Sequence, residues 1–138
     1  SPTDTIMQKT FLMIAALSGA LSVALGAFAA HGLKRLLSPD NLQIFETGVR
    51  YQFYHTLALL AAGILWQSFA GTPMLWAGRL FMAGMVLFSG SLYLVCFIRH
   101  YGWGATWVGA ITPLGGLCFI AGWLLMAVAV AGNRAAAV

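Results

Sequence analysis

Charged residues are scarce in this sequence. The 138 residues include seven Lys and Arg and three Asp and Glu, so that 7% are charged, whereas a typical soluble domain has about 25%. Hydrophobic residues make up 61%. So few charges cannot cover a water-facing surface, and the apolar side chains must therefore face lipid. The composition excludes an ordinary soluble protein and predicts an integral membrane protein with one domain.

The signatures of common enzymes are also missing. The sequence has no nucleophile elbow, no glycine-rich phosphate loop and no pair of carboxylates for acid–base chemistry. It has no His-x-x-x-His or Cys-x-x-Cys pattern, so we expect no metal and no cofactor. The two cysteines, Cys96 and Cys118, are expected at different depths and unpaired. Because the basic residues flank apolar stretches instead of forming a stripe, we expect membrane lipids as partners and no nucleic acid.

Four apolar stretches are long enough to cross a bilayer. They cover residues 10–30, 54–70, 79–98 and 106–131, and Arg79, at the mouth of the third, is the only charged residue in them. As a helix, the first stretch rises about 31 Å, which matches a hydrocarbon core of about 30 Å. Short connections require antiparallel neighbours. We expect an all-α fold, an integral membrane four-helix bundle over residues 7–138, with residues 1–6 before Met7 interpreted as an expression remnant.

The segment between the first two stretches has a pattern of its own. Ser38 is a favourable N-cap, Pro39 suits the first helical position and Asp40 suits the positive end of a helix. Apolar residues then recur at spacings of three and four, at Leu42, Phe45, Val49 and Phe53. One apolar stripe on an otherwise polar helix is typical of a helix lying in the membrane surface. We therefore predict an interfacial amphipathic helix over residues 38–53.

Small residues indicate how the helices pack. In the first stretch one row contains Ser18, Ser22, Gly26 and Ala30, and a neighbouring row contains Ala15, Gly19 and Ala27. Because lipid removes the hydrophobic drive for helix association, close approach at small residues takes its place. The rows therefore predict the packing face of the first helix. Pro113 is expected to kink the fourth span or to free a backbone carbonyl there.

Four short motifs resemble one family of membrane proteins. They are Gly26–Leu33 (GAFAAHGL), Thr47–His55 (TGVRYQFYH), Phe88–Tyr93 (FSGSLY) and Ile111–Gly116 (ITPLGG). In this order they resemble the family called domain of unknown function 423, which is similar to the transmembrane protein 256 group. The resemblance runs from about Met7 to Asn133. It implies a four-span protein of a bacterial inner membrane, and it supplies no catalytic residue.

Polar residues are predicted to gather at one face of the membrane. On the four-span topology the first and third loops share a side, and these residues fall at that level: His31, Glu46, Arg50, Tyr54, His55, Arg99 and His100. Glu46 and Arg50 have the i,i+4 spacing of a helical ion pair. Polar groups at membrane depth tend to pair with one another. Three interpretations stay open: a structural cluster, a site for a lipid head group or small anion, and a metal or haem site.

Two classes of function are compatible with these features. The first is a non-enzymatic accessory, scaffold or lipid-interacting module, whose partners are lipids, other membrane proteins or a second copy of the chain. The second is a small-solute or ion transporter or channel acting as an oligomer, although such proteins usually carry an ionisable residue near the midplane. The side with the first and third loops has four basic residues against three on the other. This small excess favours a cytoplasmic position for that side.

Overall fold

The computed structural model describes residues 1–132, and every regular element among them is helical. Two long helices come first, with short elements between them: α1 (Pro2–Phe28), the π-helical turn η1 (Ala29–Leu33), α2 (Lys34–Leu36) and α3 (Pro39–Phe69). The next rod consists of α4 (Thr72–Gly84), the π-helical turn η2 (Met85–Ser89) and α5 (Gly90–Tyr101). A 3₁₀ turn, η3 (Thr106–Ala110), then leads into α6 (Ile111–Gly132). The predicted all-α class is confirmed, and residues 133–138 of the expected domain lie outside the described residues.

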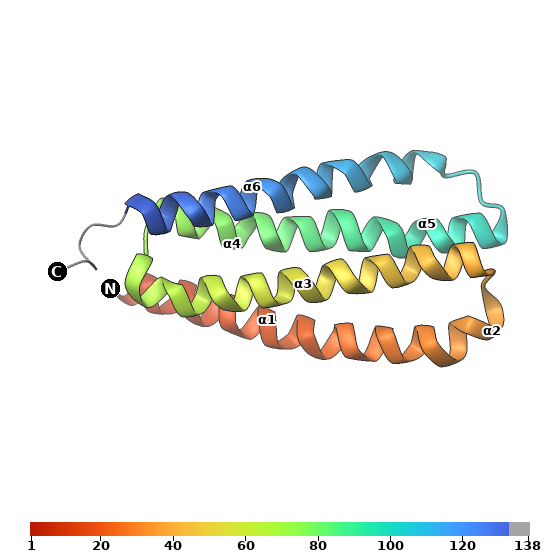
Figure 1. Ribbon diagram of the computed structural model, residues 1–138, viewed down its shortest axis with the longest axis horizontal. Coiled ribbons are helices and arrows are strands. Elements are labelled where there is room, and N and C mark those ends of the chain that lie inside the picture. Colours follow the sequence, from red (N-terminus) through yellow and green to blue (C-terminus); the bar gives the residue numbers. More distant parts are fainter. Residues whose placement is uncertain (133–138) are drawn as a thin grey trace.

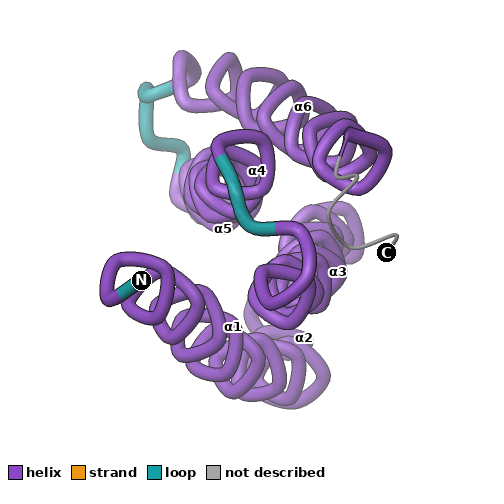
Figure 2. The backbone as a smooth tube through the Cα atoms, turned by 90° about the vertical axis from the view of Figure 1, so that its left-hand side faces the viewer, coloured by secondary structure: helices purple, strands orange, loops and turns teal. Residues whose placement is uncertain are grey.

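The helices lie side by side as long rods (Figure 1). The first rod is α1 continued by η1 and α2, the second is α3, the third is α4–η2–α5 and the last is α6. Viewed along the rods, α3 lies between α1 and the α4–α5 rod, and α6 covers another side of that rod (Figure 2). The most extensive contacts join α1 to α3 and α4 to α6. The beginning of α1 and the end of α6 lie at the same end of the molecule.

The predicted in-plane helix over residues 38–53 is wrong, because this segment is the first half of α3. The N-cap is as expected, since Ser38 Oγ accepts a hydrogen bond from the Asn41 backbone N–H at 3.2 Å. No proline or other helix stop follows before the end of α3, and buried residues continue along its length, at Asn41, Phe45, Gly48, Gln52, His55, Thr56, Ala58, Leu59, Ala62, Gly63 and Trp66. Of the predicted apolar stripe only Phe45 is buried, and Phe53 remains 39% exposed.

Gly48 explains why this half of α3 joins the bundle. A Cβ atom at Gly48 would lie 2.7 Å from Tyr93 Cε1 and 3.3 Å from the Ser89 carbonyl oxygen. The missing side chain therefore lets the α4–α5 rod approach the backbone of α3. Phe45 packs beside this point, with its ring centroid 4.8 Å from that of Tyr93. A helix held this way packs along α5 instead of lying across the bundle.

The expected packing rows of α1 are found with a small shift. Ala15 and Ser22 are buried and Gly26 is half-buried, whereas Ala27 and Ala30 are exposed and the neighbouring Ala29 is buried. Pro113 lies in the first turn of α6, where its missing N–H removes no hydrogen bond from the helix interior. It therefore marks the start of a helix, and no kink inside a span is needed to accommodate it.

Three of the rods are long and apolar enough to cross a membrane. They are Pro2–Leu36, Thr72–Tyr101 and Thr106–Gly132, and 18-residue windows within them have mean hydropathies of 2.1, 2.1 and 2.2. They contain the stretches expected at residues 10–30, 79–98 and 106–131. The stretch expected at residues 54–70 lies in α3, whose average is lowered by polar residues such as Gln52, His55 and Gln67. The crossing of α3 therefore stays a prediction.

Candidate functional site

The seven residues of the predicted polar cluster do not form one site in the described structure. His31 is exposed in η1, at the end of the first rod. Arg99 is exposed and His100 is half-buried in the last turn of α5, where the His100 ring lies 4.6 Å from that of Tyr101. Basic side chains in a last helical turn complement the negative end of the helix dipole. These three residues therefore lie at one end of the bundle.

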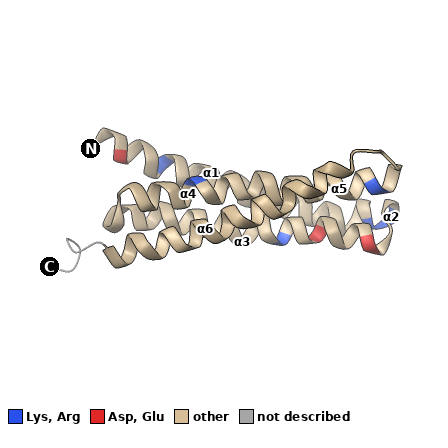
Figure 3. Cartoon of the chain, turned by 90° about the horizontal axis from the view of Figure 1, so that it is seen from above, with Lys and Arg blue, Asp and Glu red and all other residues tan. Residues whose placement is uncertain are grey.

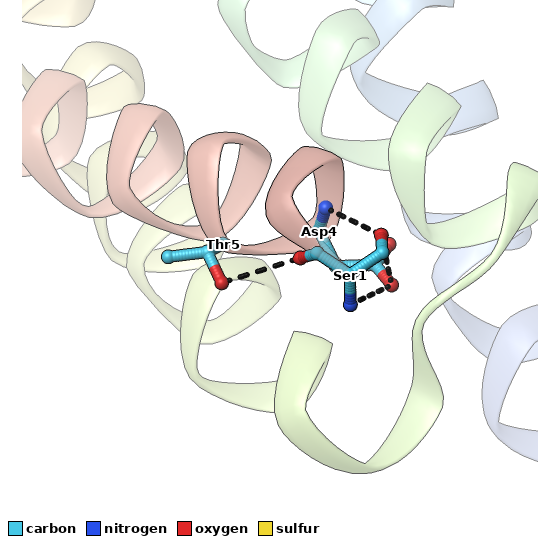
Figure 4. A network of polar contacts seen from close by, with 3 residues as sticks. All are labelled: Ser1, Asp4 and Thr5. Atoms are coloured by element: carbon cyan, nitrogen blue, oxygen red, sulfur yellow. Dashed lines mark hydrogen bonds and ion pairs between the residues drawn. The ribbon is translucent and has the colours of Figure 1, made fainter.

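Glu46 and Arg50 do not form the expected ion pair. Within residues 1–132 the only ion pair joins the amino group of Ser1 to Asp4 at 3.5 Å, at the start of α1 (Figure 4). Arg50 is exposed and its Nη2 donates a hydrogen bond to Thr47 Oγ1 at 3.2 Å. Glu46, one turn away, is half-buried. The guanidinium of Arg50 is therefore left without an acidic partner from the described part of the chain.

His55 belongs to the bundle interior instead of the membrane face. It lies near the middle of α3 and is 5% exposed. Its Nδ1 lies 2.8 Å from the Tyr51 carbonyl oxygen, and the indole Nε1 of Trp123 donates to its Nε2 at 3.0 Å. Its ring stacks on that of Phe119 in α6, with 3.5 Å between centroids and 8° between planes. The expected second span began at residue 54, which placed His55 at its mouth, whereas α3 begins 15 residues earlier, at Pro39, so that His55 lies in the middle of the helix.

These two hydrogen bonds determine the chemical form of His55. An indole N–H can only donate, so Nε2 must carry a lone pair, and a carbonyl oxygen can only accept, so Nδ1 must carry the proton. The imidazole is therefore neutral and both of its nitrogens are occupied. A metal or haem iron would have to displace Trp123 to reach it. Among the described residues no group of three His, Cys, Asp or Glu side chains could hold a metal ion.

A second polar network, which sequence reasoning missed, joins α1, α3 and α5. Tyr93 donates to Gln52 Oε1 at 2.6 Å, and Gln52 Nε2 lies 3.3 Å from both the carbonyl and the hydroxyl oxygen of Ser18. Ser18 in turn bonds the Thr56 hydroxyl at 2.7 Å. Buried polar groups of this kind act as glue between helices in lipid. The available signal was the i,i+4 pair of Gln52 and Thr56 within an apolar run.

Other polar contacts between helices come from the segments that resemble the family. Ser89 Oγ donates to the Gly48 carbonyl oxygen at 2.7 Å, joining η2 to α3. The hydroxyls of Ser91 and Thr112 are 2.5 Å apart and join α5 to α6. Each bond connects residues of two different motifs. The bond between Gln52 and Tyr93 joins the same two motifs as the bond between Ser89 and Gly48. These motifs therefore contribute several of the polar contacts between the rods.

Several grooves open on the sides of the rods, and two of them lie along the middle of α1. The larger, of about 520 Å³, lies between α1 and the α4–α5 rod and is lined by Ile14, Ser18, Leu21, Gln52, Met82, Met85, Val86, Gly90 and Tyr93. The smaller, of about 260 Å³, is lined only by residues of α1 and α3, namely Ser22, Val23, Val49, Arg50, Phe53 and Tyr54. Both have almost entirely apolar walls. No charged side chain is buried among the described residues, whose buried polar side chains are Ser, Asn, Gln, His and Thr.

Apolar rods fastened by neutral polar contacts, with grooves that open sideways, define a multi-pass integral membrane protein. The family model described as "Protein of unknown function (DUF423)" matches residues 25–116, and the chain belongs to this family. The resemblance seen in the four motifs is thereby confirmed.

Curated relatives agree with this assignment. The chain is 42% identical to the UPF0382 membrane protein YwdK of Bacillus subtilis, over 88% of this chain and 96% of the relative. It is 39% identical to the UPF0382 inner membrane protein YgdD of Escherichia coli, over 88% of this chain and 90% of the relative. No solved structure matches the chain. The expected location, integral to a bacterial inner membrane, is confirmed, and no activity comes with the family.

Proposed function

We propose that this protein is a non-enzymatic membrane module that acts through its lipid-facing surface. The observation that carries the proposal is how the polar side chains are distributed. Interior groups such as Gln52, His55 and Ser89 bond to other helices, so they are not available to a passing solute or a substrate. The unpaired cation Arg50 and both apolar grooves are open to the side. Lipids, other membrane proteins or a second copy of the chain are the partners that such a surface can contact.

The proposal includes α3 as a fourth membrane-crossing helix. Its polar residues Gln52, His55 and Thr56 are buried against other rods, so they lower the mean hydropathy of α3 without facing lipid. Its outward side chains include Leu57 and Ile64, which are 49% and 60% exposed. The helix has 31 residues and rises about 46 Å, more than a hydrocarbon core of about 30 Å. Its first turns, with Asp40, therefore extend beyond the core.

A transporter or channel is the competing function. Conduction needs a polar or water-filled path, and ionisable residues facing the interior usually mark such paths in membranes. The buried polar side chains of the described residues are neutral, and most of them bond to another helix, although Asn41 Oδ1 has no partner. The two grooves along α1 have almost entirely apolar walls, and the polar pocket at Ser1, Asp4 and Gln8 lies at the beginning of α1 instead of the bundle interior. These features support a membrane module whose interior is packed and does not conduct solutes.

The deciding experiment makes two measurements: the flux of solute from liposomes that contain the protein, and the lipids or proteins that stay bound to it after extraction. Liposomes that contain only this protein should release a trapped ion or small solute no faster than empty liposomes. Native mass spectrometry of the protein, extracted gently from its own membrane, should find lipids or a stable protein partner attached. Flux that depends on the protein would overturn the proposal in favour of a transporter. Absence of any attached lipid or protein would overturn the surface role.

A further inference from the structure

The groove between α1 and α3 combines apolar walls with one cation. Val23, Val49 and Phe53 supply apolar surface, and Val23 and Phe53 are 67% and 39% exposed. Arg50 lies on the same wall, and Tyr54 follows it one helical turn further along α3. The space of about 260 Å³ is a little smaller than typical ligand pockets of about 300–1,000 Å³. An occupant must therefore be slender and apolar along most of its length.

Arg50 lies closer to mid-height of the bundle than to its end. Gly48, two residues before it, accepts the hydrogen bond from Ser89 at 2.7 Å. The ring of Tyr51, the residue after Arg50, lies 4.7 Å from that of Phe88. Phe88 and Ser89 are near the centre of the α4–α5 rod, which has 30 residues and rises about 45 Å. A hydrocarbon core of about 30 Å centred on this rod therefore includes the Cα atom of Arg50.

A cation at this depth on a lipid-facing helix is costly and requires a partner. Side chains on a helix lean toward its N-terminus, which directs the guanidinium of Arg50 toward the membrane face near α2. Its bond to Thr47, which lies in that direction, agrees with this orientation. On α3, the charged residues lie in the half of the helix nearer α2 (Figure 3). Because the groove wall is almost entirely apolar, the aliphatic part of Arg50 lines the groove, and its guanidinium lies at the edge and reaches toward the head-group layer.

Residues 1–132 do not neutralise this cation. A guanidinium has five N–H donors, and within the described residues Arg50 uses one of them, toward Thr47. Glu46, the nearest carboxylate along α3, makes no ion pair with it. The remaining donors form a planar fork that matches the oxygens of a phosphate. An anionic partner from outside the chain satisfies both the charge and these donors.

We infer that the α1–α3 groove binds one anionic phospholipid, with its phosphate on Arg50 and an acyl chain along Val23, Val49 and Phe53. This inference rests on the lipid-interacting role proposed above and assigns that role to one site. Tyr54 lies one turn deeper than Arg50 and is 51% exposed, so its hydroxyl is placed to donate to an ester carbonyl. The end of the bundle nearer this groove carries Lys34, Arg35 and Arg99, which add to the attraction for an anionic lipid.

The test uses the full-length chain, delipidated in detergent and titrated with single lipids. Phosphatidylglycerol and phosphatidylcholine with identical acyl chains are compared by native mass spectrometry. The wild-type protein should bind one phosphatidylglycerol about tenfold more tightly than phosphatidylcholine, as charge-assisted hydrogen bonds imply. Arg50→Gln should abolish this preference, and Arg50→Lys should restore part of it. Val23→Phe, which fills the groove, should weaken the binding of both lipids.

Two control variants make the result specific to this site. Arg35→Gln removes the same charge at the same end of the bundle but outside the groove, and it should keep most of the preference. Glu46→Gln should keep or increase the preference, because the carboxylate is not the partner of Arg50. Equal preference in wild type and Arg50→Gln, or an equal loss in Arg35→Gln, would overturn the inference. Inorganic phosphate at the same concentration should not displace the lipid, because it lacks the acyl chain.

These outcomes separate the inference from the proposed function. If both lipids bind equally well, the charge-selective site is absent although the protein still contacts lipid through its surface. Helicity by circular dichroism and the melting temperature in detergent identify any variant that fails to fold. A phosphatidylglycerol-dependent rise in melting temperature that is present in Arg35→Gln and absent in Arg50→Gln gives a second measurement of the same site.

Discussion

His55 is held by side chains and backbone from three rods. It stacks on Phe119 of α6, accepts from Trp123 of the same helix and contacts the ring of Phe81 in α4 at 5.8 Å. Aromatic stacking and one satisfied hydrogen bond together fasten α3 to α6, two helices that otherwise share few contacts. At the scale of single residues, His55 therefore has a structural role: its neutral imidazole links α3 to α6.

The first prediction concerns the His55–Trp123 hydrogen bond. Trp123→Phe should lower the free energy of unfolding by about 0.5–2 kcal/mol, because a buried acceptor on His55 loses its donor. The double variant His55→Phe, Trp123→Phe should recover part of this loss, since both polar partners are then gone and the stack on Phe119 is kept. Thermal unfolding in one detergent provides the comparison, with Trp76→Phe, a change at an exposed tryptophan, as control. If the stability losses of the single variants simply add in the double variant, the hydrogen bond has no energetic role.

The second prediction concerns Glu46 and Arg50. Their spacing in the sequence indicates a coupled pair, but the guanidinium is bonded to Thr47 instead. In a double-mutant cycle of Glu46→Ala and Arg50→Ala, the two effects on stability should therefore add within about 0.5 kcal/mol. Thermal unfolding in a zwitterionic detergent without added lipid measures the cycle. A larger coupling energy would mean that Glu46 and Arg50 form the ion pair that their spacing indicates, and that Arg50 has a partner within the protein.

At the scale of helices, α6 approaches the backbone of the α4–α5 rod most closely at Gly115. A Cβ atom at Gly115 would clash with the backbone of Leu87 and Phe88, whereas one at Gly116 would meet only Phe88 Cδ2 at 3.9 Å. Backbone atoms cannot turn aside as a flexible side chain can. The two adjacent glycines therefore differ in purpose, and only Gly115 is required for close packing.

The third prediction follows from this difference. Gly115→Ala should destabilise the protein by about 1–3 kcal/mol through overpacking. Gly116→Ala should be neutral or slightly stabilising, because alanine is the better helix former. Melting temperatures of both variants in the same detergent test the pair. If the two variants melt together, α6 does not approach the α4–α5 rod as closely as described.

The helix α3 also shows which features of the fold could be predicted from the sequence and which could not. Ser38 and Pro39 correctly locate the start of α3, because a helix N-cap is a local property. The orientation of that helix was not local: it depends on Gly48 facing Tyr93, two residues from different rods. The spacing of apolar residues could indicate an amphipathic helix but not what would cover it.

The candidate site was predictable only in part. His55 and Arg50 were identified, but their partners Trp123 and Thr47 were not, and the supposed common cluster is spread along α3 and the bundle end. The network of Gln52, Ser18 and Tyr93 was missed because each of its bonds joins separate helices. Pairing across helices depends on their register, which a single sequence does not specify.

At the scale of the whole molecule, the fourth prediction tests the crossing of α3. Single reporter cysteines at Lys9, Lys34, Gly71 and Gly104 are introduced after Cys96 and Cys118 are replaced. With four crossings, the reporters at 9 and 71 react from one side of the membrane and those at 34 and 104 from the other. A membrane-impermeant thiol reagent on inside-out and right-side-out vesicles gives the measurement. Labelling of 34 and 71 from the same side would mean that α3 does not cross.

The pairing of rods has a consequence for how the protein is made. The most extensive contacts join α1 to α3 and α4 to α6, so each pair is a helical hairpin formed by neighbours in the chain. During synthesis the first hairpin can therefore assemble before α4 has left the ribosome. The contacts of α3 with the α4–α5 rod, which are as extensive as its contacts with α1, and the smaller contact of α3 with α6 have to form afterwards. A gene split at the turn between Phe69 and Thr72 should accordingly yield two halves that find each other in the bilayer.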